Sequence, residues 1–239
     1  MATGLSYSWN AWRGDLFGLV AVAEFCRTNW RGIAVAAPSD DDDDLFSEIN
    51  DLISKARDLR VARAEEILQQ DGPGFGAFFA QLLALTPGSH PNTLKILEMA
   101  ARVGEVVAIW FKLRFNRARP QQVFPGLMPM LPPPGHASYP SGHALQSRLI
   151  ALALAQVYDY AGHERPVIRT ALITLSSRIA ENREIAGVHF KTDSECGQAI
   201  AEAAMAYLQI CPTYLQIRTL AREEPAAPLV LTPAPECGP

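Results

Sequence analysis

The stretch Pro140-Ser141-Gly142-His143 stands where a proline-rich loop, residues 131–139, meets an apolar helical segment. A serine and a glycine at a helix start leave backbone N–H groups unpaired, and the helix dipole adds partial positive charge at the same place. Such a helix end favours a bound anion. The sequence therefore predicts an anion site at this helix start, with the imidazole of His143 beside it.

Size and composition predict one helical domain. The chain has 239 residues, 49% of them hydrophobic, which is enough to bury a substantial core. We expect a single domain over residues 1–222, with core motifs in residues 112–197 and a Pro- and Ala-rich tail at residues 223–239. The net charge of −4 indicates no broad basic surface, so nucleic acid is not an expected partner. The longest apolar stretch, residues 149–157, is far shorter than the ~20 residues of a membrane span.

Cysteine usage and the N-terminal region predict the compartment. The four cysteines show no C-x-x-C spacing, which argues against a zinc site or a dense disulfide framework. Residues 1–15 show no basic segment followed by a long apolar one, so no secretory signal is predicted. We accordingly expect reduced thiols and a cytoplasmic location. The many apolar helices are also compatible with a packed homodimer.

Helical periodicity recurs along the chain, and no segment reads as a convincing strand. Helices are expected at residues 15–29, 45–70, 75–85, 92–116, 144–160, 166–182 and 193–220, the last with a break at Pro212. Asn92 or Thr93 is the expected N-cap of the fourth helix. After Pro120 the prolines forbid regular helix until Ser141, and a loop of this length is usually functional or disordered. The expected fold class is an all-α helical bundle.

Five aspartates at residues 40–44 precede the second expected helix. Acidic residues at a helix start complement the helix dipole, whereas calcium needs ligands spread around a turn. We therefore favour a solvated N-terminal cap over a calcium site.

Two further motifs carry cations and imidazoles. The first is Lys112-Leu-Arg-Phe-Asn-Arg-Ala-Arg119-Pro120. Lys112 and Arg119 are seven residues apart, which is two helical turns, so we expect both on one helix face before Pro120 turns the chain away. On spacing alone, a pair of solvated surface cations is the commoner arrangement.

The second motif runs from Arg183 through Gly187 and His189 to Asp193. If this segment is helical, the i, i+4 spacing lets the Asp193 carboxylate accept a hydrogen bond from one nitrogen of His189. The other nitrogen is then free to attack or to ligate. A surface His–Asp pair that caps the helix beginning at Asp193 is the alternative.

Together, the motifs Lys-x6-Arg-Pro, Pro-Ser-Gly-His and Arg-x5-His-x3-Asp resemble, in order and spacing, those of type 2 phosphatidic acid phosphatases and vanadium-dependent haloperoxidases. The resemblance covers about residues 112–197 and implies the helical bundle of that superfamily. One departure is Asn182, where the pattern usually has serine. We expect this change to weaken at most a contact behind the site, because all the charged and imidazole groups are present.

The resemblance also implies a role for each motif residue. His189 is the nucleophile of a phosphatase, forming a phosphohistidine, or the vanadium ligand of a haloperoxidase. His143 is the acid–base on the opposite side, and Asp193 orients His189. Neither chemistry requires a divalent metal. The oxygens of phosphate or vanadate are bound by Lys112, Arg119, Ser141, the backbone N–H of Gly142, and Arg183.

The shared site does not choose between the two chemistries, because vanadate is an isostere of phosphate. His136, seven residues before His143, resembles a catalytic histidine of bromide-oxidising haloperoxidases; a simple lining of the loop is the alternative. The related soluble phosphatases are typically exported and the lipid phosphatases have membrane helices, features not seen here. Haloperoxidases, however, are commonly longer and often have tryptophan where Leu113 stands.

On this balance the sequence predicts a vanadate-dependent haloperoxidase that oxidises bromide or iodide with hydrogen peroxide, with vanadate as its cofactor. The alternative is a metal-independent acid phosphatase that hydrolyses phosphomonoesters through a phosphohistidine and needs no cofactor. A third hypothesis is a non-catalytic helical protein that binds phosphate. The presence of every catalytic group argues against it.

Overall fold

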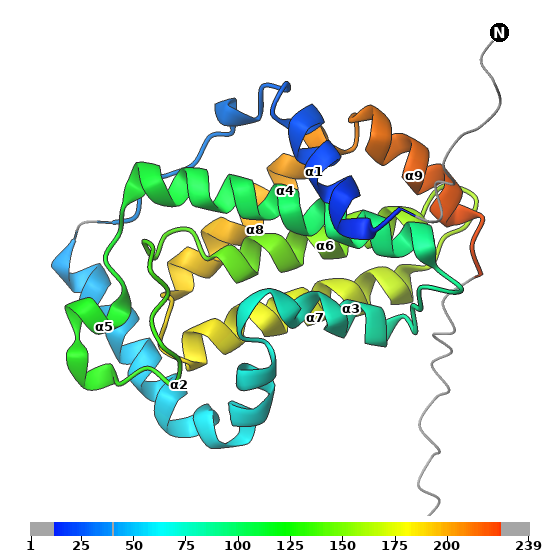
Figure 1. The fold of residues 1–239 in the computed structure, drawn as a ribbon. Coiled ribbons are helices and arrows are strands. Elements are labelled where there is room, and N and C mark those ends of the chain that lie inside the picture. The colour runs from blue at the N-terminus through cyan, green and yellow to red at the C-terminus, as the bar shows by residue number, and fades with distance from the viewer. Residues whose placement is uncertain (1–11, 40, 226–239) are drawn as a thin grey trace, which may run out of the picture.

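The computed structural model describes residues 12–39 and 41–225, which form an all-α bundle (Figure 1). In these ranges the one β-type pairing is an isolated bridge between Tyr160 and His163. The fold class expected from the sequence is therefore confirmed. The helices are α1 (Gly14–Phe25), α2 (Asp42–Gln69), α3 (Gly76–Leu82), α4 (Pro91–Phe115), α5 (Pro120–Val123), α6 (Gly142–Tyr158), α7 (Pro166–Ile185), α8 (Lys191–Leu208) and α9 (Pro212–Arg222).

The central helix is α6, which packs against α4, α7 and α8 (Figure 1). Its first turn approaches α8 closely, because a Cβ on Gly197 would lie 2.7 Å from the carbonyl oxygen of Ser141. Only glycine permits this approach without displacing the backbone. The contact brings the start of α8 against the start of α6, where the backbone N–H of Ser141 donates to the carbonyl of Asp193 at 2.8 Å.

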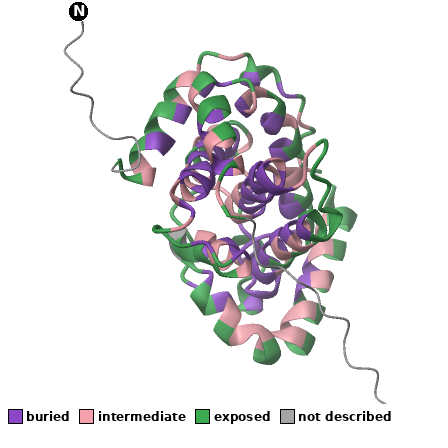
Figure 2. Ribbon diagram, turned by 90° about the vertical axis from the view of Figure 1, so that its right-hand side faces the viewer, coloured by how far each residue is buried: buried purple, intermediate pink, exposed green. Residues whose placement is uncertain are grey.

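The outer helix α2 lies across α7 and the short 3-10 turn Pro125–Leu127. Asp41 is its N-cap and accepts hydrogen bonds from the backbone N–H groups of Asp43 and Asp44. The N-terminal cap expected for the aspartates is thus confirmed. Figure 2 shows the buried residues gathered on the central helices, while much of the outer surface is exposed. Among the described helices, none combines the length and apolarity needed to cross a membrane.

The start of α4 differs from the expected one. The helix begins at Pro91 with His90 at the N-cap position, not at Asn92 or Thr93. The backbone N–H groups of Asn92 and Thr93 are instead bound by the carboxylate of Glu224, at 2.6 and 3.0 Å. A side chain far along the sequence has taken the capping role, so the local pattern could not indicate it.

The proline-rich segment contains more helix than expected. α5 and the 3-10 turn Pro125–Leu127 both lie between Pro120 and Ser141. Each has its proline at the first position, where the missing N–H is not needed. Most of the tail predicted at residues 223–239 lies outside the described residues.

Candidate active site

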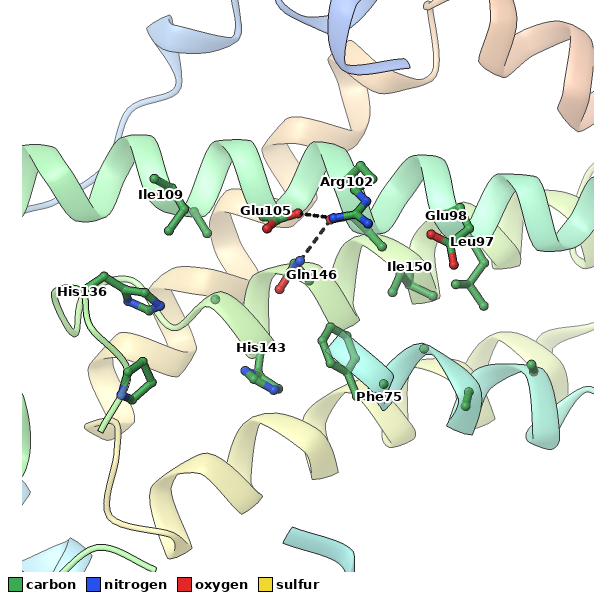
Figure 3. A pocket seen from close by; sticks show the side chains of 18 of the residues that line it. Phe75, Leu97, Glu98, Arg102, Glu105, Ile109, His136, His143, Gln146 and Ile150 are labelled. Atoms are coloured by element: carbon green, nitrogen blue, oxygen red, sulfur yellow. Dashed lines mark hydrogen bonds and ion pairs between the residues drawn. The ribbon is translucent and has the colours of Figure 1, made fainter. Parts of the chain in front are cut away.

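A cavity of about 730 Å³ opens beside the N-terminal end of α6. Lys112, Gly142 and His189 line it near the helix start, and its other walls come from α3, α4 and α6. Figure 3 shows His136 and His143 toward one end of this cavity, and Leu97 and Ile150 toward the other. The anion site predicted from the sequence therefore lies in a cavity large enough for an organic ligand.

Lys112 and Arg119 converge by a different route from the one expected. α4 ends at Phe115, and Asn116 has a left-handed backbone with φ 48°, so the chain leaves the helix before Arg119. Asparagine is one of the few residues that tolerate this conformation. Arg119 lies in the turn that precedes Pro120 and α5. The prediction of a shared helix face is therefore wrong, although both cations reach the same loop.

Both cations are buried against backbone carbonyls. Lys112 Nζ donates to the carbonyls of Ala137 and Ser138, at 2.8 Å each, and Arg119 Nη1 donates to the carbonyl of Val188 at 2.7 Å. Burial and the nearby charge of Arg119 lower the pKa of Lys112 to about 7. Burial also lowers the pKa of Arg119 to about 10. A bound anion would stabilise both positive charges.

Arg183 is only 1% exposed and is incompletely paired. Its Nη2 donates to the carbonyl of Ile67 at 2.8 Å, but Nε and Nη1 are buried without a hydrogen-bond partner. The carboxylate of Asp71 lies 3.8 Å from Nη1, beyond hydrogen-bond distance. Unpaired buried donors are costly, and an oxyanion between them would satisfy them. Arg183 does not itself line the cavity, but its unpaired donors fit the oxyanion contact predicted for it.

The start of α6 completes the cradle. Ser141 is its buried N-cap and accepts a hydrogen bond from the N–H of Ala144 at 3.4 Å. A Cβ placed on Gly142 would lie 3.8 Å from Cε of Lys112, an ordinary van der Waals distance, so the lysine side chain passes close to the helix start. An anion at this helix start would face the positive end of the helix dipole.

His189 and Asp193 form a buried pair. The Nδ1 of His189 lies 3.1 Å from Oδ2 of Asp193, and both residues are nearly inaccessible to solvent. The pair is not built on a helix face, because α8 begins at Lys191, after His189. Asp193 caps the first turn instead, and Oδ2 also accepts the N–H of Phe190 at 3.0 Å. The condition of helical geometry at His189 is therefore not met, although the hydrogen bond between the two side chains forms. The capping alternative describes the backbone, but the pair is buried and not at the surface.

The chain reverses just before this pair, at Gly187. Its φ of +80° is a left-handed conformation that a side chain would strain, and it ends α7. The N–H of Gly187 donates to the carbonyl of Glu184, and that of Val188 to the carbonyl of Arg183. This tight turn brings His189 back beside the end of α7 that carries Arg183.

The protonation states of the pair follow from these contacts. Burial raises the pKa of Asp193, but the hydrogen bond from His189 and the nearby charge of Arg117 outweigh it and hold this pKa below its usual range. Burial lowers the pKa of His189, so its imidazole is neutral. An ionised carboxylate only accepts, so Nδ1 of His189 carries the proton. Its Nε2 then keeps a lone pair available for bonding to phosphorus or vanadium.

His143 and His136 are oriented by different partners. The Nε2 of His143 lies 3.0 Å from the carbonyl oxygen of Gln70, so this nitrogen carries a proton. The Nδ1 of His136 lies 3.0 Å from Nη2 of Arg119, which only donates, and 3.2 Å from the carbonyl oxygen of Ala137, which only accepts. Burial and the charges of Lys112 and Arg119 lower the pKa of His136, which favours its neutral form.

Three residues that contact this site from behind were not predicted from the sequence. Ser138 Oγ donates to Oδ2 of Asp193 at 2.5 Å, and Arg117 Nη1 donates to Oδ1 at 2.8 Å. Glu48 in turn accepts from Arg117. Ser138 lies in the loop before Pro140, and Arg117 lies in the motif from Lys112 to Pro120. Both could therefore have been considered as site residues from the sequence. Nothing in the sequence around Glu48 links it to the site.

Asn182, which departs from the usual serine, holds α2 against α7. Its Nδ2 donates to Glu66 at 3.0 Å and to Gln70 at 2.8 Å, and its Oδ1 accepts from Arg63 at 3.0 Å. All three partners lie on α2 or at its C-cap. The asparagine therefore connects the outer helix to the helix that carries Arg183.

Residues 93–217, more than half of the chain, match the PAP2 superfamily, and the protein belongs to this superfamily. All nine site residues predicted from the sequence fall within the matched range, whereas α2 lies outside it. The membership suggested by the three motifs is thus confirmed.

Individual relatives match over shorter segments. The chain is 32% identical over 87 residues to a non-specific acid phosphatase of Salmonella typhi, covering 36% of this chain and 32% of that protein. It is 29% identical over 89 residues to one of Salmonella typhimurium strain LT2, covering 37% and 33%. The matches thus span about a third of the length of these curated relatives. A transmembrane PAP2 type phosphatidylglycerolphosphate phosphatase from Bacillus subtilis has a TM-score of 0.39 at 15% identity, over 82% of both chains.

Proposed function

We propose that the protein is a metal-independent acid phosphatase that hydrolyses phosphomonoesters through a phosphohistidine on His189. The observation that carries this proposal is the pair of unpartnered donors on buried Arg183, together with an imidazole whose Nδ1 is held by Asp193. The similarity to acid phosphatases favours this function over the haloperoxidase to which the sequence led.

Substrate binding would place the phosphate among buried donors. Lys112, Arg119 and Arg183 would contact its non-bridging oxygens, and the N–H groups at the start of α6 would complete the contacts. Charge-assisted hydrogen bonds of this kind are short and strong. They also suit the trigonal-bipyramidal transition state, because the same oxygens spread outward as the phosphorus is transferred.

In the first chemical step, Nε2 of His189 attacks phosphorus and the P–O bond to the ester breaks. His143, in its positively charged form, gives the proton on Nδ1 to the departing oxygen, so the product is a neutral alcohol or phenol, while Nε2 keeps its proton on the Gln70 carbonyl. The imidazole of His189 becomes positively charged as the P–N bond forms. Asp193 compensates this charge through the hydrogen bond to Nδ1.

In the second step, water attacks the phosphohistidine and His143 takes one proton from it. The P–N bond breaks, inorganic phosphate leaves, and the electron pair of that bond returns to Nε2 of His189. Both histidines are then in their starting states, so the cycle is balanced. The same residue serves first as acid and then as base.

The rest of the cavity would accept the organic part of the ester. Its lining follows α4 from Lys112 back to Leu94, a helical rise of about 27 Å. Apolar side chains, including Ala101 and Ala108, form part of this wall, and the charged Glu98, Arg102 and Glu105 form the rest. We therefore infer that esters of extended apolar alcohols or phenols bind better than esters of small polar alcohols.

The test is hydrolysis of nitrophenyl phosphate between about pH 4 and pH 8. We expect turnover that persists with a chelator present, is inhibited by orthovanadate and is abolished in His189→Ala. Quenching in alkaline denaturant during turnover should trap a phosphoryl group that is labile in acid and stable in base, as a phosphohistidine is. Absence of turnover across this pH range would overturn the proposal.

A second candidate function is the haloperoxidase, because His136 lines the cavity and contacts Arg119. The unpaired donors of Arg183 suit vanadate as well as phosphate, since both are tetrahedral oxyanions. Lys112, Arg119 and Arg183 would hold vanadate and Nε2 of His189 would ligate it. Bound vanadate would supply the activation of hydrogen peroxide toward bromide or iodide. Bromination of a phenolic dye that requires added orthovanadate, and that falls in His136→Ala, would support this function; no vanadate-dependent bromination would exclude it.

A further inference from the structure

Arg117 lies between two carboxylates that are far apart in the sequence, Glu48 and Asp193. Its Nη1 donates to Oδ1 of Asp193 at 2.8 Å, and its Nη2 donates to Oε2 of Glu48 at 2.5 Å. The side chains of Arg117, Glu48 and Asp193 are 10%, 14% and 0% exposed, so water screens these charges poorly. The guanidinium also lies over the ring of Phe190, 4.1 Å from its centroid.

Both oxygens of Glu48 are engaged. Oε1 accepts from the hydroxyl of Thr192 at 2.6 Å and from its backbone N–H at 3.2 Å. Oε2 accepts from Arg117. Glu48 belongs to α2, outside the residues that match the superfamily. The outer helix therefore reaches the carboxylate that orients the proposed nucleophile, with a single residue between them.

The charges of Glu48, Arg117 and Asp193 affect how well a positive charge on His189 is compensated. Asp193 paired with Arg117 alone would form a neutral ion pair and would compensate a positive imidazole weakly. Glu48 adds a second negative charge on the far side of Arg117, so the three residues together carry a net charge of −1. Part of the guanidinium's hydrogen-bonding capacity is also directed away from Asp193. The carboxylate facing His189 thus stays strongly negative.

We propose that Glu48 and Arg117 are positioning residues that set the charge Asp193 presents to His189, and thereby stabilise the phosphohistidine step. This inference rests on the proposed function, because the charge to be compensated arises when Nε2 is phosphorylated. The hydrogen bond between His189 and Asp193 is present without substrate and can be measured separately. The positioning role of Glu48 and Arg117 can therefore be refuted while the proposed phosphatase function holds, and the reverse is also true.

The variant that isolates the charge is Glu48→Gln, which keeps the size of the side chain. We expect kcat for nitrophenyl phosphate to fall about tenfold or more, the effect typical of partners behind an active-site ligand. KM should stay within about twofold, because the groups that bind phosphate are unchanged. Glu48→Asp keeps the charge and should restore part of the loss.

Two control variants on α2 separate this effect from simple detachment of the helix. Glu65→Gln removes an exposed carboxylate that contacts only Gln69 among the hydrogen bonds found, and should match the wild type. Lys55→Gln breaks the contact of α2 with Glu184, at 2.6 Å, and should lower Tm. Its kcat should fall by less than that of Glu48→Gln at an equal or larger loss of Tm.

The deciding readout is the imidazole proton between His189 and Asp193, observed by NMR with 15N-labelled histidine and assigned by its loss in His189→Ala. A less negative Asp193 accepts more weakly, so this resonance should move upfield in Glu48→Gln and stay in place in both controls. An unchanged resonance in Glu48→Gln overturns the inference, whatever kcat does. If the wild type hydrolyses no phosphomonoester, the proposed function fails while this resonance still decides the role of Glu48.

Discussion

The inner helix α6 and the outer helix α2 serve the site in opposite ways. α6 buries 12 of its 17 residues and contributes groups that face the cavity, including Gly142 and His143. α2 buries three of its 28 residues and contributes groups that contact other site residues rather than the cavity. The groups expected to touch the anion lie in the superfamily match, and those that hold them from α2 lie outside it.

Backbone geometry explains part of the difference. The last carbonyls of a helix have no partner within it. At the end of α2, the carbonyl of Ile67 accepts from Arg183 and that of the C-cap Gln70 contacts His143. Such contacts depend on where the helix ends and hardly on which side chains it carries. A motif search therefore finds the residues of α6 and overlooks the contribution of α2.

The strongest test of the inner region is His189→Ala. If this imidazole is the nucleophile, kcat for nitrophenyl phosphate should fall by at least about 10⁴-fold, as in other enzymes that lose a nucleophile. The far-UV circular dichroism should be unchanged, because His189 lies outside the helices. Residual turnover within about tenfold of the wild type would show that another group attacks phosphorus.

Arg183→Gln tests the buried donors without removing the nucleophile. We expect kcat/KM to fall on the order of 10²–10³-fold, the typical cost of losing a transition-state donor. Inhibition by orthovanadate should weaken in parallel. Arg169→Gln is the matched control on the same helix, since its partner Asp159 lies in an exposed contact away from the cavity. Equal losses in both variants would contradict the role of Arg183.

Asn182→Ala tests the attachment of α2. Loss of three buried or half-buried hydrogen bonds should lower the free energy of unfolding by about 1–3 kcal/mol, measured by urea denaturation. Arg178→Gln removes an exposed contact to the same Glu66 and should cost less than about 1 kcal/mol. A larger cost for Arg178 than for Asn182 would show that the exposed contacts hold α2.

The smallest expected effect is the pH dependence of substrate capture. With the pKa of Lys112 lowered to about 7, the free enzyme loses this positive charge as pH rises above that value. We therefore expect kcat/KM to fall by up to about tenfold per pH unit on the alkaline side. The Lys112→Arg variant keeps its positive charge, so the fall of its kcat/KM on the alkaline side should begin at a higher pH. An alkaline limb at the same pH in both proteins would assign the limb to another group.

From the sequence alone, the helical bundle, the helix start at Ser141 and Gly142 and the charged groups around it could be predicted. Helical periodicity, N-caps and helix dipoles act over a few residues, so they are readable in the chain. The expected route for Lys112 and Arg119 was nevertheless wrong, because the left-handed Asn116 ends α4 earlier than the motif spacing implies.

Tertiary structure decided the contacts between distant segments. Glu224 caps α4, and Arg117 connects Glu48 to Asp193; both contacts join residues far apart in the sequence. The burial that leaves two donors of Arg183 unpaired also arises only in the folded chain. Whether such residues meet depends on helix ends and packing angles, which no local pattern encodes. The identity of the cradle residues was therefore local information, whereas their burial, their pairing and the support from α2 arise only from the folded chain.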